Sequence, residues 1–254
     1  MDYQYIGFEV ASGAARLTFK RPPVNVLNIA MMREINLALD GLDPATAKAL
    51  VIAAEGKAFS AGVDVAEHTA DKVGEMIEVF HGIFRRLDQL DVPTLAIVQG
   101  AALGGGCEVA LFCDLILASE NAKFGQPEIK VGVLAPIAAV ILPRLVSRAK
   151  ALELLLIGET IDAAEAYRLG LVNKVVSPDQ LPAAAGEMIG KLTSLSGVVL
   201  RMTRRAARLG GQGAFGEALN QVESLYLSEL MKTHDANEGL TAFLEKRPPV
   251  WKDQ

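Results

Sequence analysis

Short, almost wholly apolar segments alternate with longer amphipathic ones through the first half of the chain. Ala49–Ala54 (ALVIAA), Thr94–Val98 (TLAIV) and 114–119 (DLILAS) each have the length of a single strand. A strand buried on both faces of a parallel sheet has this composition, because helices cover both faces. Residues 72–90 and 105–112, which have helical patterns, lie between these runs. The alternation predicts an α/β fold and disfavours an antiparallel sandwich.

The region before the first apolar run adds two strands and a helix. Residues 5–10 and 14–20 are rich in β-forming side chains and are separated by Gly13. Apolar residues recur at helical spacing over 29–42, and Asn28 before them is a residue type that caps helices. We therefore expect a strand–strand–helix unit at the start of the chain.

The second half of the chain is mostly helical in pattern. Ser147 and Asp162 stand where they can cap helices, 172–176 predicts one more strand, and Pro178 stands at the favoured first position of a helix. No strand pattern follows Thr193. The tail has little apolar surface for a core of its own, so we expect it to pack on the main body or on a neighbouring subunit. Its three expected helices are 197–209, 214–231 and 235–245.

Composition excludes several classes of protein. With 51% hydrophobic residues in 254, the chain can bury a core, and disorder is excluded. The net charge is −5 and no basic cluster is dense, so nucleic acid is not an expected partner. Two cysteines, Cys107 and Cys113, make no disulfide framework, which favours a reducing, cytoplasmic compartment. We expect no signal peptide and no membrane segment, because the apolar run 131–142 is shorter than the roughly 18–20 residues of a span.

Several familiar catalytic motifs fail on inspection. The triplet Gly104–Gly106 lacks the Lys-Ser/Thr pair of a P-loop. The pentad 58–62 is close to GxSxG, but Ala58 replaces the first glycine, which disfavours a serine hydrolase. No metal site is expected either, because the histidines lack HExxH-type spacing and no cysteine pair accompanies them. These histidines are His68, His81 and His234.

Two glycine-bearing turns stand where ligands of α/β sheets gather. Residues 60–64 (SAGVD) follow ALVIAA, and Gly104–Gly106 follow TLAIV. Ligands bind outside the carboxyl ends of parallel strands, and glycine lets backbone N–H groups approach them closely. Two such turns could direct two N–H donors at one oxygen, as an oxyanion hole does. Tight turns alone would also explain the glycines.

Two glutamates occur in apolar surroundings. Glu108 lies in CEVALF and Glu128 in FGQPEI. Partly buried carboxylates can be held at pKa values that suit proton transfer, with one giving a proton and the other taking one. Taken singly, either glutamate is equally explained as a helix cap or as a partner of a buried arginine. Together with the two turns, the pair favours an acid–base site.

These segments together resemble one family. The strings AFSAGVDV, GAALGGGCEVALFCDLILAS and AKFGQPEIKVG are similar, in order and spacing, to the crotonase (enoyl-CoA hydratase/isomerase) superfamily. RPPVNVLN near the start and EGLTAFLEKRPPVW at the end extend the resemblance over essentially the whole chain. It implies a spiral of ββα turns over 1–195, a C-terminal helical trimerisation region over 196–254, and a homotrimer or a homohexamer made of two trimers.

The resemblance also implies an activity. Val63 and Gly105 match the residues whose backbone N–H groups hold the thioester oxygen. Glu108 matches the residue that activates water, and Glu128 the residue that protonates carbon. An intact pair favours hydration of an unsaturated acyl-CoA, with CoA as part of the substrate and no metal or redox cofactor. An enoyl-CoA isomerase or a ring-opening hydrolase on the same scaffold is the alternative, and a non-enzymatic CoA-binding or RNA-associated relative is a third.

Contacts to CoA are implied for a further set of residues. Ser60, Ala61 and Asp64 fall in the segment that contacts CoA. Phe243 and Lys246 match residues that an adjacent subunit supplies to it. His68 lies near the expected acyl pocket and is assigned no catalytic role.

One position departs from the family pattern. Many hydratases have Pro-Gly where this chain has Ala135-Pro136, and the glycine N–H there can hold the attacking water or the carboxylate. Proline has no N–H, so simple short-chain hydration is in doubt. The strings SAGVDVAEH and KVGVLAP are similar to the cyclohexa-1,5-diene-1-carbonyl-CoA hydratases. This similarity favours a cyclic, conjugated diene as the acyl group.

Overall fold

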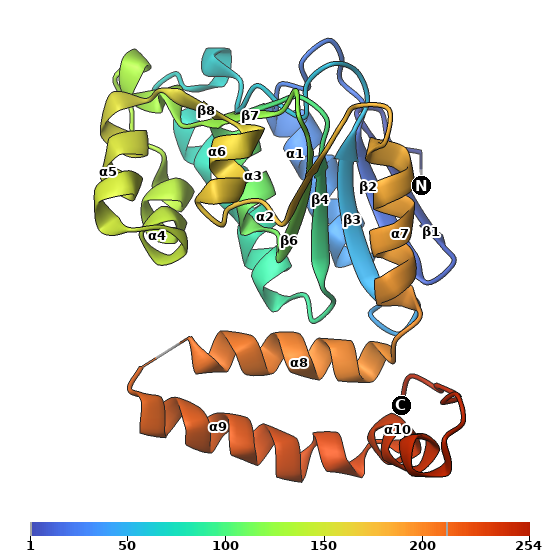
Figure 1. Ribbon diagram of the computed structural model, residues 1–254. Helices are drawn as coiled ribbons and strands as arrows, with labels where there is room; N and C mark the ends of the chain where they lie inside the picture. Colours follow the sequence, from blue (N-terminus) through green and yellow to red (C-terminus); the bar gives the residue numbers. More distant parts are fainter. Residues whose placement is uncertain (1, 212) are drawn as a thin grey trace.

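The computed structural model describes residues 2–211 and 213–254. Its main sheet has six strands in the order β1-β2-β3-β4-β6-β9 (Figure 1). Only the β1–β2 pair is antiparallel among the paired strands of this sheet, as the strand–strand unit at the start of the chain requires. The strands are β1 (Ile6–Ala11), β2 (Ala14–Phe19), β3 (Ala49–Ala54), β4 (Thr94–Val98), β6 (Leu115–Ser119) and β9 (Lys174–Val176).

The wholly apolar runs are buried on both faces, as their composition predicts. In β3, Leu50 and Ile52 pack into the large core beneath α1 (Ile29–Asp40) and α2 (Val73–Gln89). Their neighbours in β3 and β4 face the other way, into a smaller core beneath α7 (Leu181–Thr193), which covers the opposite face of the sheet in Figure 1. Alternate residues of one strand therefore pack into two different cores.

A second, three-stranded sheet positions the candidate site. It has the order β5-β7-β8, with β5 (Ala101–Leu103) leading into the turn at Gly104 and β7 (Lys123–Gly125) leading toward Glu128. Its third strand is β8 (Thr160–Asp162). Each strand has three residues, and pairs such as Ala102 with Phe124 join distant parts of the chain. None of these three strands is predicted from the sequence, because so short an element has no local periodicity.

Helix starts follow the caps expected from the sequence, with one correction. Asn28, Ser147 and Asp162 each accept a backbone N–H at the start of their helices. The helix expected at Pro178 begins at Leu181 instead, because 178–180 form a turn closed by a hydrogen bond from Gln180 N to Ser177 O. Pro182, and not Pro178, is therefore the proline in the first turn of this helix. The remaining helical elements are η1 (Val65–Glu67), α3 (Gly105–Phe112), η2 (Pro127–Val131), α4 (Pro136–Leu145), α5 (Arg148–Ile157) and α6 (Ala163–Arg168).

The C-terminal helices form a layer beneath the sheets (Figure 1). They are α8 (Gly197–Gly210), α9 (Phe215–Ser228) and α10 (His234–Glu245), with the short η3 (Leu230–Lys232) interrupting the single helix expected over 214–231. Arg204 holds α8 to the body through Asp114 Oδ2 at 2.8 Å and the carbonyl of Leu87 at 3.1 Å. No helix in the two described ranges is long and apolar enough to cross a membrane.

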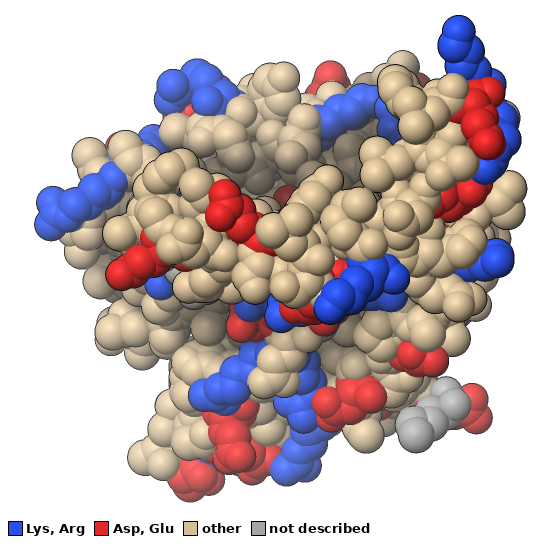
Figure 2. Space-filling view, turned by 90° about the horizontal axis from the view of Figure 1, so that it is seen from below, with Lys and Arg blue, Asp and Glu red and all other residues tan. Residues whose placement is uncertain are grey.

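This layer buries few large apolar side chains, in agreement with its weak apolar pattern. Val198 and Leu225 are buried, whereas Phe215 and Leu244 are about four-fifths exposed. The face seen from below carries broad uncharged areas between small groups of basic and acidic residues (Figure 2). Exposed aromatic and aliphatic side chains on this scale mark a surface that can bind a further protein surface.

Candidate active site

The two glycine-bearing turns pack backbone against backbone. Leu103 N donates to Ser60 O at 2.9 Å, and Ser60 N donates to Ala101 O at 3.1 Å. Gly62 has φ +104°, and a Cβ there would lie 3.0 Å from Leu103 O. A Cβ on Gly106 would lie 2.5 Å from Ser60 Cβ. Both glycines are therefore required by the close approach of the turns and not only by local turn geometry.

The N–H groups of Val63 and Gly105 are available to a ligand. Leu27 N donates to Gly62 O and Asp64 N donates to Leu27 O, so the N–H of the residue between them, Val63, points away from Leu27. Gly105 is the first residue of α3, where an N–H has no acceptor within the helix. Neither N–H donates to an acceptor in the part of the chain that the structure describes. Both residues line the same cavity.

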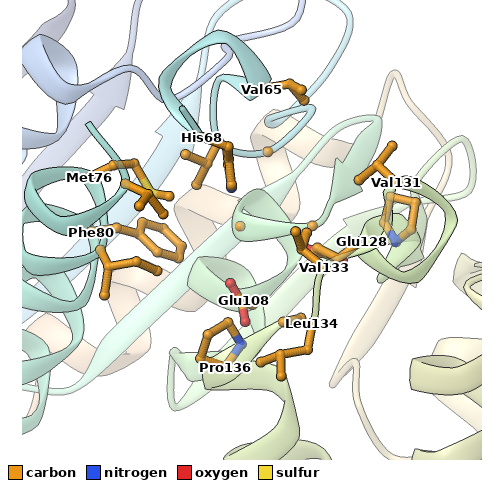
Figure 3. Close-up of a pocket in the computed structure, with 18 of the residues that line it drawn as sticks. Val65, His68, Met76, Phe80, Glu108, Glu128, Val131, Val133, Leu134 and Pro136 are labelled. Atoms are coloured by element: carbon orange, nitrogen blue, oxygen red, sulfur yellow. The ribbon is translucent and has the colours of Figure 1, made fainter. Parts of the chain in front are cut away.

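This cavity has a volume of about 620 Å³ and mostly apolar walls. In Figure 3, Met76 and Phe80 of α2 lie on one side, and Val131 and Val133 on the other. Glu108 lies at the centre, above Pro136. A cavity of this kind suits an apolar group whose reacting atoms meet a few polar ones. Further lining residues are Ala61, Val63, Val65, His68, Gly104, Gly105, Glu128 and Leu134.

Glu108 is buried and is held by the start of a neighbouring helix. Its side chain lies on α3, the residue is 2% exposed, and Oε1 accepts a hydrogen bond from Ala138 N at 2.8 Å. Burial raises the pKa of Glu108 to about 7, the N–H groups of Ala138 and Ile137 oppose the rise, and the charge of Glu128 adds to it. A carboxyl group with this pKa can take or give a proton near neutral pH.

Pro136 does not leave Glu108 without a donor, which corrects part of the sequence-based expectation. Pro136 is the first residue of α4, where a missing N–H costs nothing because that position has no helical acceptor. The free N–H groups of the first turn, at Ile137 and Ala138, serve the carboxylate instead. The N–H group that a glycine could provide at 136 is thus replaced by N–H groups one and two residues later in the same helix.

Glu128 lies in η2 and lines the same cavity. Burial raises its pKa, while its own backbone N–H and the nearby charge of His68 lower it. A Cβ on Gly104 would lie 2.7 Å from Glu128 Oε1, so the carboxylate rests against the backbone of the turn. Gln126, a buried neighbour, is not predicted from the sequence, although a polar amide within FGQPEI could have indicated it.

The three residues of the 60–64 turn that are expected to contact CoA differ in exposure and in their hydrogen-bond partners. Ala61 is exposed and lines the cavity. Ser60 is fully buried, and its Oγ donates to Asn25 O at 2.8 Å and accepts from Gly62 N at 3.1 Å. Asp64 caps η1 and lies 3.7 Å from the guanidinium of Arg21, outside the cavity lining. The CoA contacts of all three stay predictions, and Ser60 has its polar groups engaged inside the protein.

Phe243 and Lys246 lie in the C-terminal layer, outside the lining of the cavity. Phe243 of α10 is 82% exposed, and Lys246 ends that helix in a left-handed conformation. Neither lines the cavity of its own chain within the described residues, so their role in binding CoA stays a prediction. His68 does line the cavity, and its Nδ1 lies 3.1 Å from Asp64 O.

Comparison with known proteins defines the family. The profile of the enoyl-CoA hydratase/isomerase family matches residues 9–254. Over 240 residues the chain is 42% identical to a cyclohexa-1,5-dienecarbonyl-CoA hydratase of Thauera aromatica, with 94% of this chain and 93% of that one covered. It is 37% identical to a crotonyl-CoA hydratase of Syntrophomonas wolfei, with 97% of each chain covered.

Solved structures agree with these sequence relatives. An enoyl-CoA hydratase of Mycobacterium smegmatis superposes with a TM-score of 0.92 at 31% identity, covering 98% of this chain and 99% of that one. The crotonase-type α/β fold predicted from the sequence is thereby confirmed. This chain belongs to the enoyl-CoA hydratase/isomerase family, and the prediction of an enzyme of the enoyl-CoA hydratase type is confirmed with it.

Proposed function

We propose that this protein adds water to an unsaturated acyl-CoA thioester, with Glu108 as the base and Glu128 as the acid. The observation that carries the proposal is the convergence of four groups on one apolar cavity. Two are carboxyl groups with raised pKa values, and two are backbone N–H groups, at Val63 and Gly105, without an acceptor. An acid, a base and two donors for a developing oxyanion are what hydration of a conjugated thioester needs.

The reaction balances with these groups alone. The thioester oxygen accepts from Val63 N–H and Gly105 N–H, and Glu108 removes a proton from water as the water oxygen bonds to the β carbon. The π electrons move toward the thioester oxygen, which the two N–H groups stabilise. Loss of one such donor raises the activation barrier by about 2.7–4 kcal/mol. Glu128 then gives a proton to carbon as the carbonyl re-forms. The net change is one added water. The pair keeps its total charge of −1, and transfer of the proton from Glu108 back to Glu128 restores the starting protonation state.

We propose a cyclic dienoyl group, cyclohexa-1,5-diene-1-carbonyl-CoA, as the substrate. Support comes from the 42% identical relative, from the apolar walls of the cavity, and from Pro136, which stiffens the cavity wall because proline fixes φ. In such a diene the hydroxyl goes to the β carbon and the proton to the far end of the conjugated system. The acid and the base must therefore act on well-separated carbons. A linear 2-enoyl-CoA is the alternative substrate, since crotonyl-CoA hydratases also occur among the relatives.

Assembly into a homotrimer or homohexamer through 196–254 belongs to this proposal. The apolar side chains exposed on α9 and α10 support it, and Phe243 would then reach CoA bound to an adjacent subunit. Light scattering should report three or six copies, and a chain ending before Gly197 should be insoluble or inactive. A soluble, active, monomeric truncation would contradict the assembly.

A panel of thioesters tests the activity. Purified protein is incubated with linear and cyclic enoyl-CoA compounds, and loss of conjugated-thioester absorbance is followed. Glu108→Gln and Glu128→Gln should each abolish turnover and keep binding of a saturated CoA thioester, because both carboxyl groups move protons and contribute little binding energy. Retention of more than about a tenth of the wild-type kcat by either variant would exclude the two-carboxylate mechanism.

A further inference from the structure

Gln126 is a buried amide that the reaction sequence above does not use. It is 2% exposed and precedes Glu128 by two residues, at the start of η2. With its amide nitrogen turned toward Glu128, that nitrogen lies 3.2 Å from Oε2 and 3.3 Å from Oε1. The opposite orientation would place the amide oxygen against two carboxylate oxygens and leave its nitrogen facing only donors. The amide therefore donates to the carboxylate.

The other end of the amide faces α3. The buried thiol of Cys107 lies beside the Gln126 side chain, and burial raises the pKa of this thiol, so it stays protonated and can donate. Cys107 directly precedes Glu108 on the helix. An S–H that donates to the amide oxygen leaves the amide nitrogen free for Glu128. Gln126 thus connects the helix that carries one glutamate to the carboxylate of the other.

The Glu128 carboxylate is confined on two sides. Gly104 lies against Oε1, since a Cβ there would be 2.7 Å away, and the Gln126 amide faces both oxygens. Other titratable groups near Glu128 are Glu108 and Cys107 of α3 and His68 after η1. Lys130 of the same segment lines the cavity as well. Among the neutral groups around Glu128 in the described residues, the Gln126 amide lies within 3.2–3.3 Å of both carboxylate oxygens.

We propose that Gln126 is a positioning residue that holds the Glu128 carboxylate toward the cavity and stabilises its ionised form. The catalytic meaning of this inference rests on the proposed hydration, in which Glu128 becomes an anion as it gives its proton to carbon. A donor that is already in place when that charge develops lowers the barrier without contributing to substrate binding. Loss of the donor should consequently lower kcat and leave KM nearly unchanged.

The test compares Gln126→Met, which keeps length and apolar volume, with Gln99→Met. Gln99 donates to the carbonyls of Ala54, Gly56 and Ala58, so its loss removes side-chain hydrogen bonds without touching the Glu128 carboxylate. Infrared titration follows the protonated-carboxyl band that Glu128→Gln removes. In Gln126→Met this band should titrate about one pH unit higher, because a donor to the charged form is lost. It should stay unmoved in Gln99→Met.

Kinetics complete the comparison. In Gln126→Met, kcat should fall about tenfold or more with KM changed less than about twofold, and the basic limb of the pH profile should move upward with the band. Gln126→Leu, which also removes the amide donor, should move the band in the same direction even if Gln126→Met folds poorly. An unmoved band in either folded variant overturns the inference. Because the infrared readout needs no turnover, a moved band in a protein that hydrates nothing would refute the proposed function alone.

Discussion

Glu108 Oε1 accepts a 2.8 Å hydrogen bond from the backbone N–H of Ala138, so the buried carboxylate of one helix is held by the first turn of another. Together with the N–H of Ile137, this contact replaces the donor that Pro136 lacks. It opposes, without cancelling, the effect of burial, which keeps the pKa of Glu108 at about 7. The carboxylate is therefore oriented for its task and still basic enough to take a proton.

The pKa of Glu108 predicts a pH-dependent stability. Because the folded-state value of about 7 exceeds the ordinary 4.5, the folded protein binds this proton more tightly than the unfolded chain. The free energy of unfolding should thus fall as the pH rises from about 4.5 to about 7. Glu108→Gln cannot ionise and escapes this loss, so its stability relative to wild type should increase by about 3 kcal/mol between pH 4 and pH 8. Denaturant unfolding at both pH values measures the difference, and a constant difference would show that Glu108 titrates normally.

Gly104→Ala should displace Glu128 from its place in the cavity. The new Cβ would lie 2.7 Å from Oε1, and the φ of +51° is unfavourable for alanine. We expect kcat to fall about 10²-fold, because misplacing a reacting group by about 1 Å has effects of this size. Gly74→Ala in α2 is the control, since a Cβ there meets nothing within 4 Å and should leave kcat unchanged. Equal activity of the two variants would mean that Glu128 has no fixed position.

Pro136→Gly should change the choice of substrate. Wild type is expected to hydrate cyclohexa-1,5-diene-1-carbonyl-CoA with a kcat/KM at least about tenfold above that for crotonyl-CoA, which is about 1.4 kcal/mol in transition-state binding. A glycine adds a further backbone donor beside those of Ile137 and Ala138 and frees the chain, so the preference should shrink. Pro143→Ala, at an exposed position of the same helix, controls for the removal of a proline from α4. An equal or reversed preference in wild type would leave the family assignment standing and remove the cyclic substrate.

Elements defined by a local pattern could be predicted from the sequence, and those defined by distant partners could not. The runs ALVIAA and TLAIV carry their own signal because successive residues, such as Leu50 and Val51, face opposite cores and both must be apolar. Strands β5, β7 and β8 lack such a signal, since their pairing depends on segments brought together by the fold. The helix expected at Pro178 begins later because proline is equally favourable in a four-residue turn, and Ser177–Gln180 form such a turn.

The candidate site was predictable to a similar extent. Val63, Gly105, Glu108 and Glu128 line one cavity, as the turns and the apolar settings of the glutamates indicate, while their catalytic roles stay predictions. The donor to Glu108 could not be foreseen, because a backbone N–H at Ala138 has no signature in side-chain type. Groups that orient the reacting residues come from backbone and packing, so they appear only in three dimensions.

The most direct test of the two-glutamate hydration is the mass of the product formed in ¹⁸O-labelled water. Wild type with cyclohexa-1,5-diene-1-carbonyl-CoA should yield a CoA thioester that has gained one water carrying the label, and Glu108→Gln and Glu128→Gln should yield none. A product of unchanged mass would indicate an isomerase, and free CoA or a ring-opened acid would indicate a hydrolase. Either result, or label incorporated equally by wild type and both variants, would contradict hydration by Glu108 and Glu128.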